Sequence, residues 1–427
     1  MTPVRRLLAV AALALALTLG ATGARAQPTL RGEPGPSATV IPQRFLALVN
    51  AVVVDVRDGG VTSAATVVVR DGRIVSVGSD AAPVGAEVVD VKGRWVVPGL
   101  IDAHTHLETM DAARRAVMSG VTTARSASVS NFQDVALREF VSAGYLAGPA
   151  ILAAGVYVTP NDPPWLADPA MVSVWPRVDT TERLRRLVRL NQARGATVIK
   201  TRGTERAGRP DTDPREQVYT AAELRAVVDE ARSLGMDVLC HTHGTEGSEA
   251  AIQAGVRSIE HGTYLTDAQL KTMAARGIYW VPTYSTLIDL IEPGGDYDDP
   301  IVHNRGLFML PVAKRALVAG IAAGVKIVTG ADSSYGPEST TRISHEVANF
   351  VAAGMTPLQA LQAATVTAAE LLRLDGTVGV VAAGFEADLI VVEANPLVDV
   401  RALQDPLFVM SNGRVAVNRL EFGRAGR

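Results

Sequence analysis

Apolar and polar positions follow one repeated pattern through the middle of the chain. An Ala-rich amphipathic segment, a glycine, a short β-branched run and a polar residue follow one another in six places: 119–125, 193–200, 234–241, 254–261, 275–283 and 323–332. Glycine directly after a helix is typical of a left-handed C-cap. Thr220 and Glu223 further predict a capping box at the start of the helix that ends before Gly235.

Two more apolar runs, 95–103 and the segment near 149–157, bring the number of expected strands to eight. Helices that alternate with buried strands predict parallel βα units. Eight such units in order predict an α/β fold, a (β/α)8 TIM barrel over residues 98–375. The active site of such a barrel lies at the carboxyl ends of its strands.

The two flanks of this region have a different pattern. Segments 44–97 and 376–420 contain apolar strands with the turn pairs Asp71-Gly72 and Asn412-Gly413, which favour tight β-hairpins. We therefore expect a small composite β-sandwich domain built from both ends of the chain. Residues 27–43, rich in Pro and Gly, predict an extended N-terminal arm.

The first 26 residues are typical of a cleavable secretory signal peptide. Arg5 and Arg6 precede an apolar run, and Ala-Arg-Ala precedes Gln27. This pattern predicts a secreted or periplasmic protein, and no later apolar stretch is long enough for a membrane span. Cys240 is the only cysteine, so no disulfide can form within the chain.

The net charge of −3 is mildly acidic and offers no electrostatic case for binding nucleic acid. The most basic stretch, 181–194, places Leu184, Leu187 and Val188 on one helical face and its arginines elsewhere. We interpret it as a solvated surface helix.

Histidines gather where the barrel would have its active site. Five of the seven lie at expected strand ends: His104, His106, His241, His243 and His261. Alternate strand residues point to one face, so His104 and His106 share one volume. An isolated pair of this kind is as often structural as metal-binding. Four or more imidazoles together with the carboxylate of Asp332, however, suit a divalent metal, most simply zinc.

Lys200 ends the fourth expected strand and points into the same cluster. An ammonium group cannot bind a cation, so two interpretations stay open. Lys200 is either paired with Glu205 or Asp332, or burial lowers its pKa. In the second case the neutral amine adds carbon dioxide and becomes a carbamate that bridges two metal ions.

These residues resemble a known family. The segments GLIDAHTHL, CHTHG, SIEHGTYL and TGAD, with the strand that ends in Lys200, are similar to the amidohydrolase superfamily. The resemblance covers most of 44–420 and is strongest to its imidazolonepropionase-like, Xaa-Pro dipeptidase (prolidase) and ochratoxinase-related branch. It implies two divalent metal ions, a bridging hydroxide, a carbamate on Lys200 and a homo-oligomer.

The resemblance also implies a role for each site residue. It places His104, His106 and Asp332 on one metal and His241 and His261 on the other. Carboxylated Lys200 lies between the two metals. Asp332 accepts the proton of the attacking hydroxide and returns it to the leaving amine.

The substrate contacts are less defined. By resemblance, His243 contacts the scissile carbonyl oxygen or a substrate carboxylate, with a supporting role behind the metal ligands as the alternative. Tyr264 and Tyr284 are candidates for hydrogen bonds to a terminal carboxylate, or are packed aromatics. Arg125 either helps to bind that anion or pairs with an internal acid.

Two long proline-containing loops, 155–169 and 201–214, depart from the dipeptidase pattern. Both are candidate specificity walls or lids, so the particular substrate stays open. We expect a metal-dependent hydrolase of a dipeptide, an N-acyl amino acid or a related small amide.

Three alternatives remain. The first two are a cyclic amide hydrolase and a deaminase; mononuclear deaminases generally lack the bridging lysine. The third is a noncatalytic binding barrel, which predicts a missing ligand, whereas none is missing here.

Overall fold

The computed structural model describes residues 45–160, 180–294 and 297–421. These residues belong to one compact unit, Val40–Arg427. The predicted signal peptide and N-terminal arm therefore lie outside the described residues, as does most of the predicted loop 155–169.

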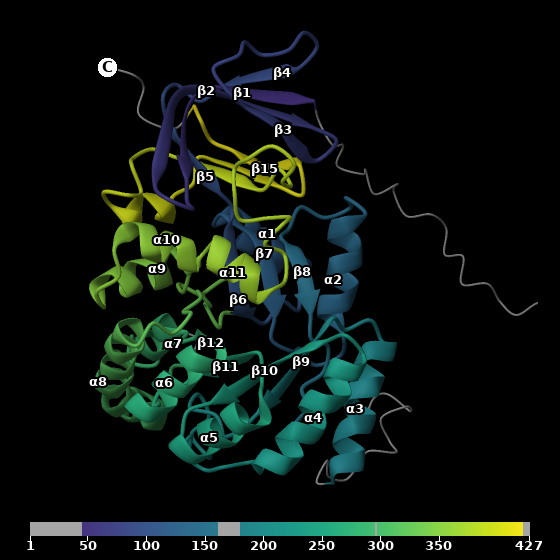
Figure 1. Cartoon of the computed structure of the whole chain (residues 1–427), viewed down its shortest axis with the longest axis vertical. Helices are drawn as coiled ribbons and strands as arrows, with labels where there is room; N and C mark the ends of the chain where they lie inside the picture. Colours follow the sequence, from purple (N-terminus) through teal and green to yellow (C-terminus); the bar gives the residue numbers. More distant parts are fainter. Residues whose placement is uncertain (1–44, 161–179, 295–296, 422–427) are drawn as a thin grey trace, which may run out of the picture. The chain divides into compact units, whose positions relative to one another are not determined.

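One sheet combines strands from both ends of the chain. Its hydrogen-bonded order is β15-β14-β13-β5-β1-β2-β3, and β4 pairs with β1. In Figure 1 the purple strands of the amino-terminal part and the yellow strands of the carboxyl-terminal part lie in one region. The strands are β1 (Leu46–Asp55), β2 (Gly60–Arg70), β3 (Arg73–Gly78), β4 (Glu87–Asp90), β5 (Trp95–Pro98), β13 (Leu389–Val392), β14 (Phe408–Ser411) and β15 (Arg414–Asn418).

Both predicted hairpin turns are present in this sheet. Asp71 and Gly72 have φ values of 51° and 79°, and Asn412 and Gly413 have 52° and 70°. Positive φ at both central residues matches the right-handed twist of the flanking strands. The strands from the amino-terminal and carboxyl-terminal flanks join where β13 pairs antiparallel with β5.

Seven parallel strands form two further sheets, with the orders β6-β7-β8 and β12-β11-β10-β9. Helices alternate with them along the chain, and α3 to α6 accompany β9 to β12 (Figure 1). The mixed α/β fold is thus confirmed. The strands are β6 (Leu100–Thr105), β7 (Val121–Ser126), β8 (Ala150–Ala153), β9 (Val198–Arg202), β10 (Asp237–Thr242), β11 (Ser258–His261) and β12 (Tyr279–Val281).

The helices that connect and cover these strands are mostly short. Among the described residues, none has both the length and the apolar character needed to cross a bilayer. They are α1 (Met110–Met118), α2 (Gln133–Ser142), α3 (Thr181–Ala193), α4 (Ala221–Ser233), α5 (Thr245–Ala254), α6 (Asp267–Arg276), α7 (Tyr284–Asp289), α8 (Pro300–Ala322), α9 (Ile343–Ala352), α10 (Pro357–Ala363), α11 (Val366–Leu371) and the 3-10 helix η3 (Val400–Gln404).

Single bridges connect the two parallel sheets. Val158 pairs with Thr201 on one side, and on the other Trp280 pairs with Ile327 and Thr105 with Ser333, all in parallel orientation. The predicted strand at 323–332 is therefore present only as isolated bridges. Its backbone bonds both neighbouring strands: the N–H of Val328 donates to the Trp280 carbonyl at 2.9 Å, and the N–H of Asp332 donates to the His104 carbonyl at 2.7 Å.

The predicted helix signals are also present. Thr220 and Glu223 form the capping box of α4, and α5 ends at Gly255 with a φ of 80°. In α3, the buried residues include Leu184, Leu187 and Val188, as the apolar spacing predicts. These faces bury the helices against the strands and hold the strand ends in fixed positions.

Candidate active site

The functional side chains come from the carboxyl ends of the parallel strands. Parallel pairing sets Lys200 beside Leu239 and His261 beside Thr242. His104 lies on β6 and His241 on β10. His106 and His243 each directly follow the last residue of the same strand. Adjacent parallel strands end at one edge, so residues far apart in sequence meet there.

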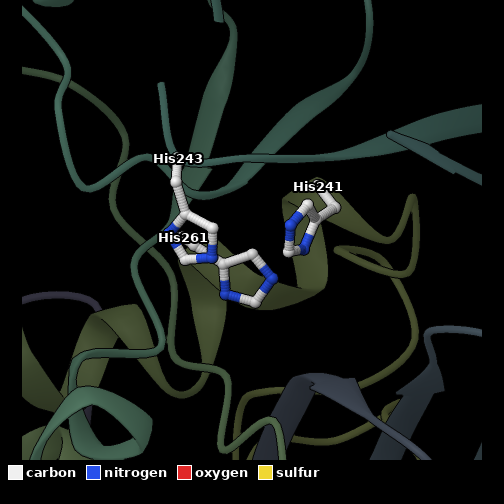
Figure 2. A group of neighbouring side chains, drawn as sticks. All are labelled: His241, His243 and His261. Carbon is white, nitrogen blue, oxygen red and sulfur yellow. The ribbon is translucent and has the colours of Figure 1, made fainter. Parts of the chain in front are cut away.

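Four of the imidazoles are in close contact. The ring centroids of His241 and His261 are 4.4 Å apart, and those of His104 and His261 are 4.9 Å apart. His243 stacks on His261 with 18° between the ring planes. Figure 2 shows the rings of His241, His243 and His261 gathered at one point, so their lone pairs can converge on one cation.

Asp332 and Lys200 join this cluster. One carboxylate oxygen of Asp332 lies 3.4 Å from Nε2 of His104 and 3.2 Å from Nε2 of His106. The Nζ atom of Lys200 lies 3.0 Å from the same Nε2 of His104. The alternative partner of Lys200, Glu205, instead forms an ion pair with Arg202 at 2.8 Å.

Backbone strain accompanies these positions. His261, Thr283 and Asp332 have φ values of 66°, 47° and 48°. Non-glycine residues in the left-handed region cost about 1–3 kcal/mol each, and such residues collect at functional sites. The surrounding pairing holds each of them, and the turn directs the side chain into the space between the strand ends.

Hydrogen bonds to the backbone determine which ring nitrogens stay available. Nδ1 of His106 lies 2.7 Å from the Ser128 carbonyl, and Nε2 of His241 lies 3.1 Å from the Glu205 carbonyl. A carbonyl only accepts, so each of these nitrogens donates its proton. The opposite nitrogen of each ring therefore keeps a lone pair for a metal.

A buried ion pair supports His104 from behind. Nδ1 of His104 lies 2.6 Å from Glu260, and Glu260 also accepts from Arg125 at 2.9 Å. Burial opposes ionisation of Glu260, but Arg125 and His104 together lower its pKa to about 2. The carboxylate thus stays charged and keeps Nδ1 of His104 protonated, which leaves Nε2 for the cluster.

Burial keeps the imidazoles neutral. It lowers the pKa of His104 to about 4 and that of His243 to about 3. The pKa values of His241 and His261 also lie well below the ordinary value for the same reason. Burial lowers the pKa of Lys200 to about 8, so a neutral amine is accessible near neutral pH.

These groups border a cavity of about 330 Å³, large enough for a small ligand. Every predicted metal ligand lines it, as does His243. Tyr264, Tyr284 and Arg125 are not among its lining residues. The two tyrosines pack on an apolar cluster that contains Leu287, and Arg125 is 2% exposed and paired with Glu260.

None of Tyr264, Tyr284 and Arg125 borders the cavity. Their surroundings fit the packed or internally paired alternative, and contact with a substrate stays a prediction. The sequence places Tyr264 and Tyr284 beyond the expected strand ends, and in the structure both are partly buried and pack against the apolar cluster that contains Leu287. Arg125 lies within β7 and points behind His104, because its partner Glu260 is buried there.

Several cavity residues have no equivalent among the sequence-based candidates. Tyr157 and Tyr297 are the tyrosines of the cavity, and Arg206 and Arg209 contribute its basic side chains. Tyr157, Arg206 and Arg209 fall within the two loops that the sequence already marks as unusual. The individual residues follow only from how those loops fold over the strand ends.

Two groups of donor atoms fit a metal ion. They are His241, His243 and His261, and His104, His261 and Asp332, with the ligand atoms of each group within 4.8 Å of one another. The neutral imidazoles and the carboxylate are donors that zinc accepts. The sequence assigned His243 to the substrate, whereas the geometry also groups it with His241 and His261.

The chain is similar to several known proteins. The ochratoxinase of Aspergillus niger is 33% identical over 264 residues, which cover 60% of this chain and 53% of that protein. The chain thus spans about half the length of the curated relatives it matches first. A solved Xaa-Pro dipeptidase with bound methionine superimposes with a TM-score of 0.79 at 27% identity, covering 87% of this chain and 99% of the other.

A prolidase solved in complex with N-methylphosphonate-L-proline superimposes with a TM-score of 0.76 at 27% identity. The superposition covers 87% of this chain and 99% of that one. The amidohydrolase family matches residues 95–416, a segment that contains every residue of the histidine cluster, Lys200 and Asp332. From this match over most of its length, the chain belongs to the amidohydrolase family.

Proposed function

We propose that this protein is a metal-dependent hydrolase that cleaves the amide bond of a dipeptide, an N-acyl amino acid or a related small amide. The observation that carries the proposal is that Nζ of Lys200 and a carboxylate oxygen of Asp332 lie 3.0 and 3.4 Å from the same Nε2 of His104. A buried amine with a lowered pKa, beside a carboxylate and neutral imidazoles, is typical of a hydrolytic centre.

The proposal includes a closed (β/α)8 barrel. The parallel bridges Val158–Thr201, Trp280–Ile327 and Thr105–Ser333 support it, because each joins strands that neighbour one another in such a barrel. The 98–375 barrel and the composite β-sandwich of 44–97 and 376–420 belong to the same proposal. The pairing of β13 with β5 supports the composite domain.

Two divalent metal ions, zinc being the simplest, fit the donor set. His104, His106 and Asp332 would hold one ion and His241 and His261 the other, with carbamylated Lys200 between them. Two such ions lower the pKa of a coordinated water and polarise a carbonyl oxygen. The neutrality of the buried imidazoles supports this assignment, since protonated rings cannot act as ligands.

Asp332 is the residue that moves the proton in this scheme. Its carboxylate lies between His104 and His106 and borders the cavity. Burial opposes its ionisation, but the two histidines lower its pKa overall. Asp332 is therefore ionised, and it can accept the proton of the attacking water and return it to the leaving amine.

The walls of the cavity support an amide that bears both an apolar group and an anion. Leu287, Leu290 and Val129 form an apolar side, and two arginines also line the cavity: Arg206, and Arg209, which pairs with Asp211 at 3.0 Å. His243 borders the same space, and we assign it to the scissile carbonyl oxygen or to a substrate carboxylate. An N-acyl amino acid or a dipeptide presents both features.

The deaminase alternative has less support. It assigns no role to a lysine in the cluster, whereas Lys200 lies 3.0 Å from a ligand nitrogen of His104. From the predicted signal peptide, we further propose that the enzyme is periplasmic or secreted. We also propose that it acts on small molecules as a homo-oligomer.

One experiment tests the proposal directly. Zinc-loaded protein is assayed against N-acyl amino acids, Xaa-Pro and Xaa-Leu dipeptides, and lactams, while metal content is measured by mass spectrometry. We expect about two zinc ions per chain and turnover of a linear amide. Turnover of lactams alone would favour the cyclic amide alternative, and full activity with one metal in Lys200→Ala would exclude the bridged centre.

A further inference from the structure

The segment 205–216, here called the cavity loop, covers one side of the candidate active site. Its residues Arg206, Ala207, Gly208 and Arg209 line the cavity. The loop follows β9, the strand that carries Lys200, and precedes α4. Its conformation therefore decides how much space a substrate has beside the metal-binding groups.

The base of the cavity loop is fixed by close backbone contacts. Glu205 donates to the Glu216 carbonyl at 2.9 Å, and Val218 donates to the Gly203 carbonyl at 2.8 Å. A Cβ atom on Gly203 would lie 2.5 Å from the carbonyl oxygen of Gly247. The loop is thus held tightly against the start of α5.

An arginine side chain from another element contacts the tip of the cavity loop at several points. Arg305 of α8 donates through Nη1 to the carbonyls of Ala207 at 2.5 Å and Arg209 at 2.6 Å. Through Nη2 it donates to Thr212 at 2.6 Å and, more weakly, to Pro210 at 3.5 Å. One planar guanidinium thus satisfies carbonyls spread over six residues.

An aromatic side chain also packs against the tip of the cavity loop. A Cβ atom on Gly208 would lie 2.4 Å from Cε1 of Tyr297, so only glycine permits the observed approach. Tyr297 lines the cavity too, and Ala207 packs in one apolar cluster with Leu287 and Leu290. The anchored tip and α7 therefore form one continuous apolar wall.

We infer that Arg305 is a positioning residue that holds the cavity loop against α8 and thereby sets the size of the apolar subsite. The subsite accommodates the bulky apolar group of an amide substrate between Tyr297, Leu287 and Leu290. Arg305 itself does not line the cavity, so it acts through the loop. This inference rests on the proposed function only for its statement about the substrate.

Limited proteolysis tests the anchoring without reference to activity. Trypsin does not cut Arg209 because Pro210 follows, so cleavage between Arg206 and Ala207 reports on opening of the loop tip. Proteolysis follows the population of the open form when opening and closing are fast. We expect Arg305→Gln to raise this cleavage rate about tenfold over wild type.

Two variants separate anchoring from charge and from general effects on α8. Arg305→Lys keeps the charge, but an ammonium cannot span these carbonyls, so it should behave like Arg305→Gln. Arg315→Gln removes an exposed arginine from the same helix and should be cleaved at the wild-type rate. Cleavage of Arg305→Gln at the wild-type rate, with folding verified by circular dichroism, would overturn the anchoring.

Kinetics test the role in specificity. With the linear amide identified by the activity screen, Arg305→Gln should raise KM about fivefold to tenfold for a substrate with a bulky apolar group, while kcat changes less than about threefold. An acetyl or glycyl analogue should show little change in KM. Equal changes for both analogues would overturn the subsite assignment.

The variant Gly208→Ala tests the apolar subsite through a residue that lines the cavity. The added methyl group displaces Tyr297 into the subsite, so KM for the bulky substrate should rise while tryptic cleavage stays at the wild-type rate. An unchanged KM would contradict the subsite. If the wild-type protein hydrolyses no amide in the screen, the proposed function fails, whereas the proteolysis result still decides the anchoring.

Discussion

The carboxylate of Glu260 lies 2.6 Å from Nδ1 of His104, although 156 residues separate the two in the chain. Glu260 directly precedes His261 at the end of β11 and forms an ion pair with Arg125. The strand thus contributes a potential metal ligand and, next to it in sequence, a buried support for another ligand. Such supports orient metal ligands and raise their basicity.

Glu260→Gln should weaken metal binding without removing a proposed ligand. Without the charged partner, the proton of His104 is no longer held on Nδ1, and Arg125 stays buried without its carboxylate. We expect metal affinity to fall about 10-fold to 100-fold and stability to fall by about 3–5 kcal/mol. Chelator competition and urea unfolding measure the two effects.

Glu182→Gln is a matched control for that change. The Glu182 side chain is 71% exposed and pairs with Arg189 on the surface of α3, where ion pairs contribute little. Metal affinity in this variant should equal that of wild type. Wild-type metal affinity in Glu260→Gln would show that the carboxylate does not support His104.

Asp332→Asn should abolish turnover while leaving the protein folded. The amide cannot take a proton from water, so we expect kcat to fall about 10²-fold to 10⁴-fold. Steady-state kinetics and metal analysis of the same sample separate lost chemistry from lost metal. Asp111→Asn, at a side chain that is 70% exposed on α1, should keep wild-type kcat. Retained turnover in Asp332→Asn would assign proton transfer to another group.

Lys200→Ala should remove the bridge between the proposed metal positions. We expect metal content to fall from about two ions to one or fewer, with a large loss of activity. Because burial lowers the pKa of Lys200 to about 8, the neutral amine becomes more abundant as pH rises through that value. Zinc loading of wild type with bicarbonate should therefore improve between pH 6.5 and 8.5. A bicarbonate-independent loading profile would argue against a carbamate.

Glu346→Gln should change how stability depends on pH. Burial raises the pKa of Glu346 from 4.5 to about 7, and its carboxylate accepts from the backbone of Tyr284 and Ser285 at 2.8 Å. A raised folded-state pKa gives stability that is complete below pH 4.5 and is lost as pH rises through 7. Over that window, wild type should lose about 3 kcal/mol relative to the variant.

Urea unfolding of zinc-free protein between pH 4.5 and 7.5 measures this difference. The variant also loses hydrogen bonds at the start of α7, so its absolute stability is lower, and the informative quantity is the slope against pH. Glu338→Gln, at an exposed position, should follow the wild-type slope. Parallel slopes for Glu346→Gln and wild type would show that folding does not raise the pKa of Glu346.

The sequence determined the local elements because their signals are local. The capping box of Thr220 and Glu223 and the hairpin turn at Asn412-Gly413 depend on neighbouring residues alone, and both are present. The position of His104 and Lys200 at strand ends also follows from apolar runs that end in a polar residue. From the repetition of that pattern, the proposed metal ligands were expected at one place, and all of them line one cavity.

Tertiary structure alone decided which way the remaining side chains turn. Arg125 and Tyr264 occupy promising sequence positions, yet Arg125 faces Glu260 and Tyr264 packs among apolar residues. Tyr297 and Arg305 come from segments with no catalytic signal; Tyr297 lines the cavity, and Arg305 bonds the cavity loop from α8. The direction of a side chain depends on partners that are distant in sequence. A local sequence pattern cannot predict which of these partners will pair with the side chain or bury it.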